Sequence, residues 1–270
     1  MTCIILPVVP DTSIGPYGGV NPREVWFIAI VLAAVSLFGY GAVKLLGAEH
    51  GVLFAGLAGG LVSSTAVATT NARRAAAGEG APRLLSAGVA IANAVSFVRV
   101  IVIVAALKPG LLVLVAPPLG AATLIAAVYA ILAVYWQGDS KGGKSIEFEN
   151  PFSFWPVVGF AVFLGAVMML GGAVGEAFGS NGALIGAVGL GLADVDAVTI
   201  SVSRLVPQPL SAQGAGLAIL AAVASNMLPK LAISAVIGRG RFALEVAIMT
   251  AGCWLVAVAA LWATLALGLR

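Results

Sequence analysis

Charged residues are scarce in this chain: Asp, Glu, Lys and Arg make up 9% of its 270 residues, against roughly a quarter in an ordinary soluble domain. Hydrophobic residues make up 61%, and the mean hydropathy is +1.09. This composition excludes a soluble globular protein and a disordered chain, and it predicts a membrane protein in contact with the lipid bilayer. The net charge of +3 comes from only 14 Lys and Arg. It is therefore a signal of membrane topology, and we expect no nucleic-acid partner.

Cysteine and histidine are almost missing as well. Cys3 and Cys253 are isolated, and His50 stands alone at a predicted membrane edge. These residues supply neither a disulfide framework nor the spacing of a zinc site. The sequence also contains no nucleophile–His–acid set and no phosphate-binding loop. We therefore expect a protein that is not an enzyme and needs no cofactor, while the identity of any bound metal is left open.

Long windows without charge predict an all-α polytopic membrane protein with about eight transmembrane helices. The third window contains Arg99, the sixth Asp194 and Asp196, and the seventh Lys230. Pro117 and Pro118 should kink the fourth helix or delay its start to about Leu119. The eight expected spans are Val25–Val43, Gly51–Ala72, Leu84–Leu107, Leu111–Trp136, Phe154–Gly175, Gly182–Ser203, Ala212–Ile237 and Phe242–Gly268.

The loops between these spans predict which side faces the cytoplasm. One side receives Lys44, Lys108, Arg239 and Arg241. The other side receives Arg23, Arg73, Arg74, Arg83, Lys141, Lys144, Arg204 and Arg270. The excess of Lys and Arg on the second side favours it as cytoplasmic. We therefore expect a plasma membrane protein of a bacterium or archaeon, with both termini and the polar loop Gly138–Glu149 inside.

The chain also repeats itself. Asn21-Pro22 and Trp26 recur as Asn150-Pro151 and Trp155, 129 residues later, and Arg99 falls opposite Lys230 at an offset of 131. Gly60-Leu61, Ala66-Val67 and Arg73 recur at that same offset as Gly191-Leu192, Ala197-Val198 and Arg204. Chance similarity among glycine- and alanine-rich helices is the alternative explanation. We expect two parallel repeats of four transmembrane helices each, because an even number of spans returns the chain to its starting side. The expected divisions are an N-terminal stub and loop over 1–20, repeat 1 over 21–138, a cytoplasmic linker over 139–149 and repeat 2 over 150–270.

Three motifs carry a resemblance to a known family: NPREVW (Asn21–Trp26), GGLVSSTAV (Gly59–Val67) and GLADVDAVTIS (Gly191–Ser201). Over residues 4 to 265 the chain resembles the uncharacterised multi-pass domain found C-terminal to MgtC/SapB-type membrane domains. The resemblance implies a link to magnesium physiology or transport, but no established activity. Proteins of that family normally begin with an MgtC-like helical domain, and the stub Ile4–Pro10 would be the end of its last helix. Candidate partners are therefore an MgtC-like membrane domain and a second copy of this chain.

Polar residues within the predicted spans fall near the middle of the bilayer. Ionisable side chains are costly at that depth unless they are paired or hydrated, so they are candidates for a functional site. We expect an ion or substrate site at the repeat interface. Its candidate residues are Asp194, Asp196, Ser63, Ser64, Thr65, Asn93 and Asn226, with Arg99 and Lys230 as charge partners. The alternative is structural: an aspartate pairs with Arg99 or Lys230 and fixes the order of the helices.

The chemistry of this cluster leaves several functions open. Carboxylate, hydroxyl and amide oxygens suit Mg²⁺ or protons. Arg99 and Lys230 would repel a divalent cation or accept an anion instead, so a proton-coupled solute carrier is also open. We expect a carrier or channel for a small ion, and the alternative is a regulatory or assembly module that transports nothing.

The spacing of the two aspartates also predicts the shape of their helix. Residues two apart on an α-helix point about 200° away from each other, so Asp194 and Asp196 cannot both line one site on an unbroken helix. Glycine precedes both polar positions, at Gly59-Gly60 before Ser63 and at Gly189 and Gly191 before Asp194. Because Ser and Asp are preferred N-caps, we expect a break at each place and a second half-helix running inward to Arg73 or Arg204. The alternative is that the glycines serve only close packing.

Overall fold

The computed structural model describes residues 10–12, 22–23, 26, 51–136, 184–208 and 210–268. Within these residues all regular structure is helical and no strand occurs. Several predictions fall outside or almost wholly outside them: the N-terminal stub over 1–20, the first span at Val25–Val43, the linker over 139–149 and the fifth span at Phe154–Gly175.

Four segments of the described chain are long and apolar enough to cross a membrane. Helix α4 (Pro82–Leu107) is followed by the 3₁₀ turn η2 (Pro109–Leu111) and by α5 (Leu112–Tyr135). Helix α8 (Ala212–Ile233) continues into the π-helical turn η3 (Ser234–Gly238), which leads to α9 (Gly240–Ala266). These segments confirm the third, fourth, seventh and eighth predicted spans within a few residues. Pro117 and Pro118 lie inside α5 and do not delay its start.

Contacts between the helix ends fix how the four spanning helices are arranged. Arg83, at the start of α4, forms a salt bridge of 3.0 Å with Glu245, near the start of α9. Arg241 approaches the same carboxylate at 3.7 Å. Gly216, near the start of α8, packs against Leu114, near the start of α5. The α3–α4 and α8–α9 connections therefore share one end of the bundle, and the α4–α5 and α7–α8 connections share the other.

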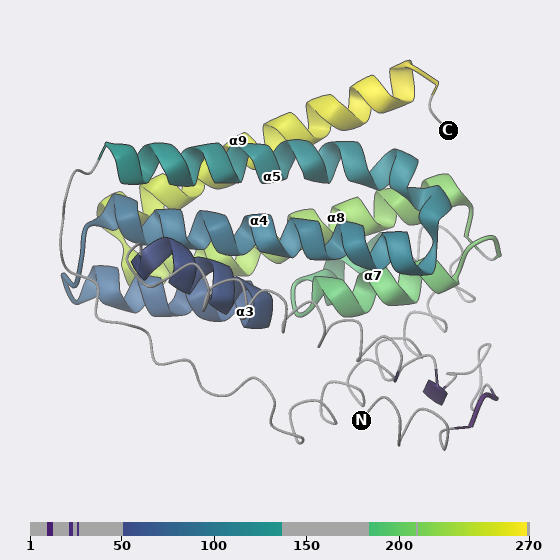
Figure 1. The fold of residues 1–270 in the computed structure, drawn as a ribbon, viewed down its shortest axis with the longest axis horizontal. Helices are drawn as coiled ribbons and strands as arrows, with labels where there is room; N and C mark the ends of the chain where they lie inside the picture. Colours follow the sequence, from purple (N-terminus) through teal and green to yellow (C-terminus); the bar gives the residue numbers. More distant parts are fainter. Residues whose placement is uncertain are drawn as a thin grey trace.

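We call the first of these the arginine-rich end, because it carries Arg73, Arg74, Arg83, Arg239 and Arg241. The other is called the far end, and it carries Lys108 and Arg204. The arginine-rich end is on the left in Figure 1, where α4 and α5 run horizontally and α9 extends toward the C-terminus on the right. The prediction that Arg83 and Arg241 lie on opposite sides of the membrane is wrong, since both contact Glu245.

Helix α3 (Gly51–Ala76) is broken rather than continuous, and its two halves fold back on each other. Ser63 has an extended backbone (φ −162°, ψ 110°). A Cβ built on Gly59 would lie 2.5 Å from Val67 Cγ2, although eight residues of straight helix span about 12 Å. We therefore describe α3 as a helical hairpin with residues 51–62 and 64–76 as its two arms.

The packing of each arm on α4 gives its direction. In the first arm, Gly56 packs on Gly88 and Gly60 on Ala92, so this arm runs parallel to α4. In the second arm, Asn71 Nδ2 donates a hydrogen bond of 2.9 Å to Leu85 O, and this arm leads back into α4. Both ends of α3 therefore lie at the arginine-rich end and its tip lies inside the bundle. The prediction that Gly51–Ala72 crosses the membrane is wrong, because apolar length does not report a reversal of direction.

The sixth predicted span, Gly182–Ser203, is also interrupted. Residues 184–191 are helical, the helix stops, and α7 (Val195–Arg204) begins after Asp194. Ten residues of helix are about 15 Å long, roughly half of the hydrocarbon core. Helix α7 ends at the α7–α8 connection, so it covers the half of the bundle next to the far end. In Figure 1, α3 and α7 accordingly occupy opposite halves of the bundle.

The directions of the helices overturn the predicted parallel arrangement of the two units. Helix α4 runs from the arginine-rich end to the far end, and α8 runs the opposite way. Helices α5 and α9 are also antiparallel, because α5 begins at the far end and α9 at the arginine-rich end. They pack against each other, with Cys253 of α9 in contact with Ala122 of α5. Counting α3 as a crossing produced the even number of spans on which the parallel prediction rested.

Small side chains allow the helices to approach closely, whereas larger ones face outward. Buried positions at the helix contacts include Ala90, Ala122, Ala126, Ala218 and Ala222. Large exposed hydrophobic side chains include Leu124, Ile131, Leu255, Val258 and Trp262. This distribution is typical of helices packed through small residues with apolar residues against lipid.

Candidate functional site at the two helix breaks

Each helix break leaves backbone carbonyls without their usual partners inside the helix. At the tip of α3, Arg99 Nη1 donates a hydrogen bond of 2.9 Å to Leu61 O. At the second break, Asn226 Nδ2 donates a hydrogen bond of 2.9 Å to Gly191 O. Both donors come from the neighbouring spanning helices, α4 and α8. Side chains of the spanning helices thus compensate both breaks.

The half-helices that follow the breaks begin in the same way. Ser63 Oγ accepts a hydrogen bond of 3.2 Å from the amide of Ala66. Asp194 Oδ1 accepts bonds of 2.8 and 3.1 Å from the amides of Asp196 and Ala197. Asp194 also has nearly the same backbone angles as Ser63 (φ −155°, ψ 113°). The predicted interruption is therefore confirmed at both places, with the caps that the sequence suggested.

Both half-helices were expected to run inward, to Arg73 or Arg204, but they run in opposite directions. The second arm of α3 runs from Ser63 to the arginine-rich end, and α7 runs from Asp194 to the far end. The predicted close packing of glycine is also present, because a Cβ on Gly56, Gly60 or Gly191 would collide with backbone atoms of α4 or α8. Packing and interruption, which the sequence analysis treated as alternatives, therefore occur together.

A buried ion pair joins the two breaks. Arg99 Nη2 lies 2.7 Å from Asp196 Oδ2, and the side chains are 12% and 8% exposed. Because Arg99 also binds Leu61 O, one guanidinium contacts the tip of α3 and the first turn of α7. The positive charge of Arg99 lies at the carboxyl end of the first arm of α3, and the negative charge of Asp196 lies at the amino end of α7. Both placements are favourable for the helix dipoles.

Lys230 is the second buried cation. It is 2% exposed, and its Nζ donates a hydrogen bond of 2.9 Å to Asn93 Oδ1, which is itself buried. Lys230 interacts electrostatically with Arg99 and Asp196. Within the part of the chain that the structure describes, however, no carboxylate lies within salt-bridge distance of it. An ammonium group can donate three hydrogen bonds, so this cation retains unused capacity.

Two further buried atoms lack a partner among the described residues: Asp196 Oδ1 and Arg99 Nε. Buried polar groups are normally hydrogen-bonded, and an unmet one carries a free-energy penalty. Both atoms belong to the ion pair that joins the breaks. Among the described residues, the ion pair and Lys230 therefore retain hydrogen-bond donors and one acceptor that no side chain or backbone group satisfies.

The structure thus gives each predicted site residue a definite position. Asp196 pairs with Arg99 and Asn93 binds Lys230, whereas Ser63, Asp194 and Asn226 cap helix segments. Ser64 is buried and Thr65 is half-buried beside Ser63. No group of three His, Cys, Asp or Glu side chains that could hold a metal ion occurs among the described residues.

A polar network at the arginine-rich end was missed by sequence reasoning. Glu245 is 7% exposed and accepts hydrogen bonds from Arg83 Nε (3.0 Å) and the Tyr129 hydroxyl (2.9 Å). The Tyr129 hydroxyl lies 2.7 Å from Ser86 Oγ. These side chains connect α4, α5 and α9. The available signal was an acidic residue only three positions inside the eighth predicted span.

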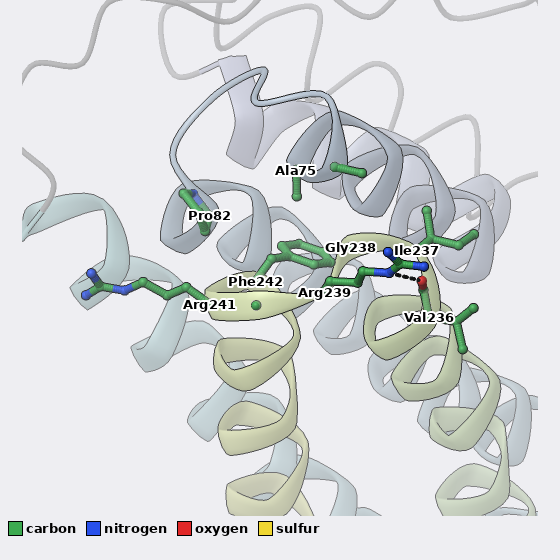
Figure 2. Close-up of a pocket in the computed structure, with 10 residues that line it drawn as sticks. Ala75, Pro82, Val236, Ile237, Gly238, Arg239, Arg241 and Phe242 are labelled. Carbon is green, nitrogen blue, oxygen red and sulfur yellow. Dashed lines mark hydrogen bonds between the residues drawn. The ribbon is translucent and has the colours of Figure 1, made fainter.

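A groove of about 540 Å³ lies beside this network, between the end of α3 and the turn from η3 to α9. Figure 2 shows the Phe242 ring lying beside Gly238 and below Ala75, whereas Arg241 points away. Arg239 Nε donates a hydrogen bond of 3.0 Å to Val236 O. The groove lies at the arginine-rich end and is separate from the two breaks.

Comparison with known proteins identifies the family. A family model described as a domain of unknown function, DUF4010, matches residues 30–238. The chain therefore belongs to the DUF4010 family. No curated protein matches the chain, and no solved structure matches it either.

Proposed function

We propose that this DUF4010-family chain is an integral membrane transport protein for a small ion or solute, with its site where the two helix breaks meet. The observation that carries the proposal is the buried Arg99–Asp196 pair between the tip of α3 and the start of α7. Interrupted helices at membrane depth are tolerated only where they are buried in protein or line a cavity, and carriers place substrate sites at such interruptions.

We also propose that the chain consists of two repeats of inverted topology. Positions 131 apart support this: Ser63 and Asp194 both start a half-helix, and Arg99 (12% exposed) and Lys230 (2% exposed) are both cations within spanning helices. Ala122 and Cys253, also 131 apart, contact each other, as residues near a twofold axis must. The axis would lie in the membrane plane, and the spans expected at Val25–Val43 and Phe154–Gly175 would complete the two repeats.

The inverted arrangement revises the predicted sidedness. Among the residues that the structure describes from Gly51 onward, five arginines lie at the arginine-rich end, against Lys108 and Arg204 at the far end, so the arginine-rich end is proposed to be cytoplasmic. Helix α5 ends there, whereas α9 ends at the far end. The polar linker after Trp136 would then be cytoplasmic in the plasma membrane of a bacterium or archaeon. The C-terminus would lie outside, which departs from the expectation of two cytoplasmic termini.

The geometry favours a proton-coupled carrier over a site that coordinates Mg²⁺. Asp194 is engaged as an N-cap and Asp196 in an ion pair, so neither carboxylate is free of partners. Arg99 and Lys230 would repel a divalent cation at short range. A carboxylate paired with arginine can exchange its partner for a proton, which is a means of coupling. The predicted link to magnesium rested on the MgtC resemblance and on the oxygen ligands of the cluster, whose two carboxylates already have protein partners.

Flux through the purified chain in liposomes tests the proposal. Proton, Mg²⁺ and anion gradients are imposed in turn, and internal pH and ion content are followed. We expect flux of one species together with protons, loss of proton movement in Asp196→Asn, and normal flux in Glu79→Gln, which alters an exposed acid. Absence of any flux, with a stable complex to another membrane domain, would support the regulatory or assembly module instead.

A further inference from the structure

We propose that the midplane site binds a small monovalent anion between Arg99 and Lys230 when Asp196 holds a proton, so that anion and proton cross together. This inference rests on the proposed transport function and names its substrate class. The observations behind it are the charges that surround Asp196 and the hydrogen-bonding positions that those groups leave unused.

Among the described residues, the charges facing Asp196 come from three helices. Arg99 approaches from α4 at 2.7 Å, Lys230 acts from α8, and Asp194 lies at the start of α7 itself. The carboxylate of Asp194 accepts two backbone amides at the amino end of α7, where negative charge is already stabilised. Asp196 is therefore the counter-ion that Arg99 and Lys230 share. When that charge is neutralised, two buried cations remain without a mobile counter-ion, and a small anion can replace it.

The proton has a defined place to bind. Asp196 Oδ2 is engaged by Arg99, whereas Oδ1 is buried and has no partner among the described residues. A proton taken from water on one side of the membrane would form an O–H bond at Oδ1 and weaken the attraction to Arg99. The same proton is released to water on the other side. One proton and one monovalent anion move together, so the complete step is electroneutral and involves no oxidation or reduction.

The cations stay in position when the ion pair opens. Arg99 keeps its hydrogen bond to Leu61 O, and Lys230 keeps its bond to Asn93 Oδ1. Arg99 Nε, which lacks a described partner, and the unused donors of Lys230 are then available to an anion. A cation at this place would face both side chains without the carboxylate, so the site discriminates against it.

Anion binding to the purified protein gives the first test, with chloride and nitrate as probes and calorimetry as the readout. For one proton taken up per anion, the affinity should fall by up to tenfold per pH unit as pH rises through the coupled range. Asp196→Asn should bind both anions with little pH dependence, and Lys230→Met should bind them at least tenfold more weakly. Affinity independent of pH in the unaltered chain would overturn the inference, as would loss of binding in Asp196→Asn.

Flux gives the second test, and its deciding measurement uses the unaltered chain. In liposomes clamped at zero membrane potential, a chloride or nitrate gradient should drive protons through the unaltered chain at one proton per anion. Asp196→Asn should carry the anion without protons. If the chain moves only a cation, the anion inference fails while the proposed transport function survives. If it moves nothing, both fail.

Discussion

Arg99 and Asp196 form a buried ion pair of 2.7 Å between α4 and α7, and the same guanidinium donates to Leu61 O at the tip of α3. One side chain therefore holds the two helix breaks together. This contact has consequences for stability, topology and access to the site.

Separating the ion pair should destabilise the protein strongly. Either Arg99→Gln or Asp196→Ala alone leaves an uncompensated buried charge, which costs about 3–5 kcal/mol of unfolding free energy. The double variant should lose clearly less than the sum of the two single losses, because neither member of the pair remains without the other. Reversible unfolding in detergent micelles measures all three values, and additive losses would mean that the two side chains are not coupled.

Reporter fusions should place the ends of α5 and α9 on opposite sides of the membrane. A fusion after Trp136 should read cytoplasmic and a fusion after Gly268 should read external, because α5 ends at the arginine-rich end and α9 at the far end. Compartment-specific reporters, one active only inside and one only outside, make the measurement. Two fusions in the same compartment would contradict the arrangement of α5 and α9.

The contact between α5 and α9 should be open to disulfide formation. Cys253 is a free buried cysteine whose Sγ lies 3.6 Å from Ala122 O. With Cys3 replaced by serine, Ala122→Cys should form an intramolecular disulfide with Cys253 under mild oxidation, seen as a mobility shift that reductant reverses. Ala130→Cys, two turns along α5, is the matched control. Crosslinking of the control alone would show that Cys253 lies opposite Ala130 rather than Ala122, and would contradict the observed contact.

Close packing of α3 on α4 should make Gly56 sensitive to a single methyl group. A Cβ at Gly56 would lie 2.5 Å from Gly88 O, whereas Gly120 in α5 has nothing within 4 Å. Gly56→Ala should lower the unfolding free energy by about 1–3 kcal/mol. Gly120→Ala should be neutral or raise it by up to about 1 kcal/mol. Equal effects would show that the first arm of α3 does not press on α4.

The sequence was sufficient to predict the membrane class, four spanning helices and the two breaks. Apolar length marks a helix such as α4 or α9 whatever its neighbours are. The breaks were predictable because glycine followed by Ser63 or Asp194 is a local N-capping pattern, and local patterns do not depend on tertiary contacts. The polar midplane residues were recognised for the same kind of reason, as ionisable groups in apolar windows.

The direction of the chain after a break was not predictable from the sequence. Hydropathy is the same for a straight span and for a hairpin such as α3, and only the contacts of Gly56 and Asn71 with α4 reveal the reversal. Two predicted crossings, at α3 and at the interrupted sixth span, were misjudged in this way, and together they changed which connections were assigned to the same side. The partners in the ion pair were not predictable from the sequence either. Charge balance allowed either aspartate to pair with either cation, and the pairing of Asp196 with Arg99 depends on the orientation of α7.

The central claim is that a transport pathway passes between the two breaks, and thiol accessibility tests it most directly. Ser64→Cys is made in a chain with Cys3→Ser and Cys253→Ser, and a membrane-impermeant thiol reagent is applied to sealed vesicles of either orientation. A pathway between the two breaks predicts reaction from both sides, faster in Ser64→Cys than in the buried control Ala90→Cys. Protection of Ser64→Cys from both sides, or reaction from one side only, would contradict a pathway that crosses the membrane here.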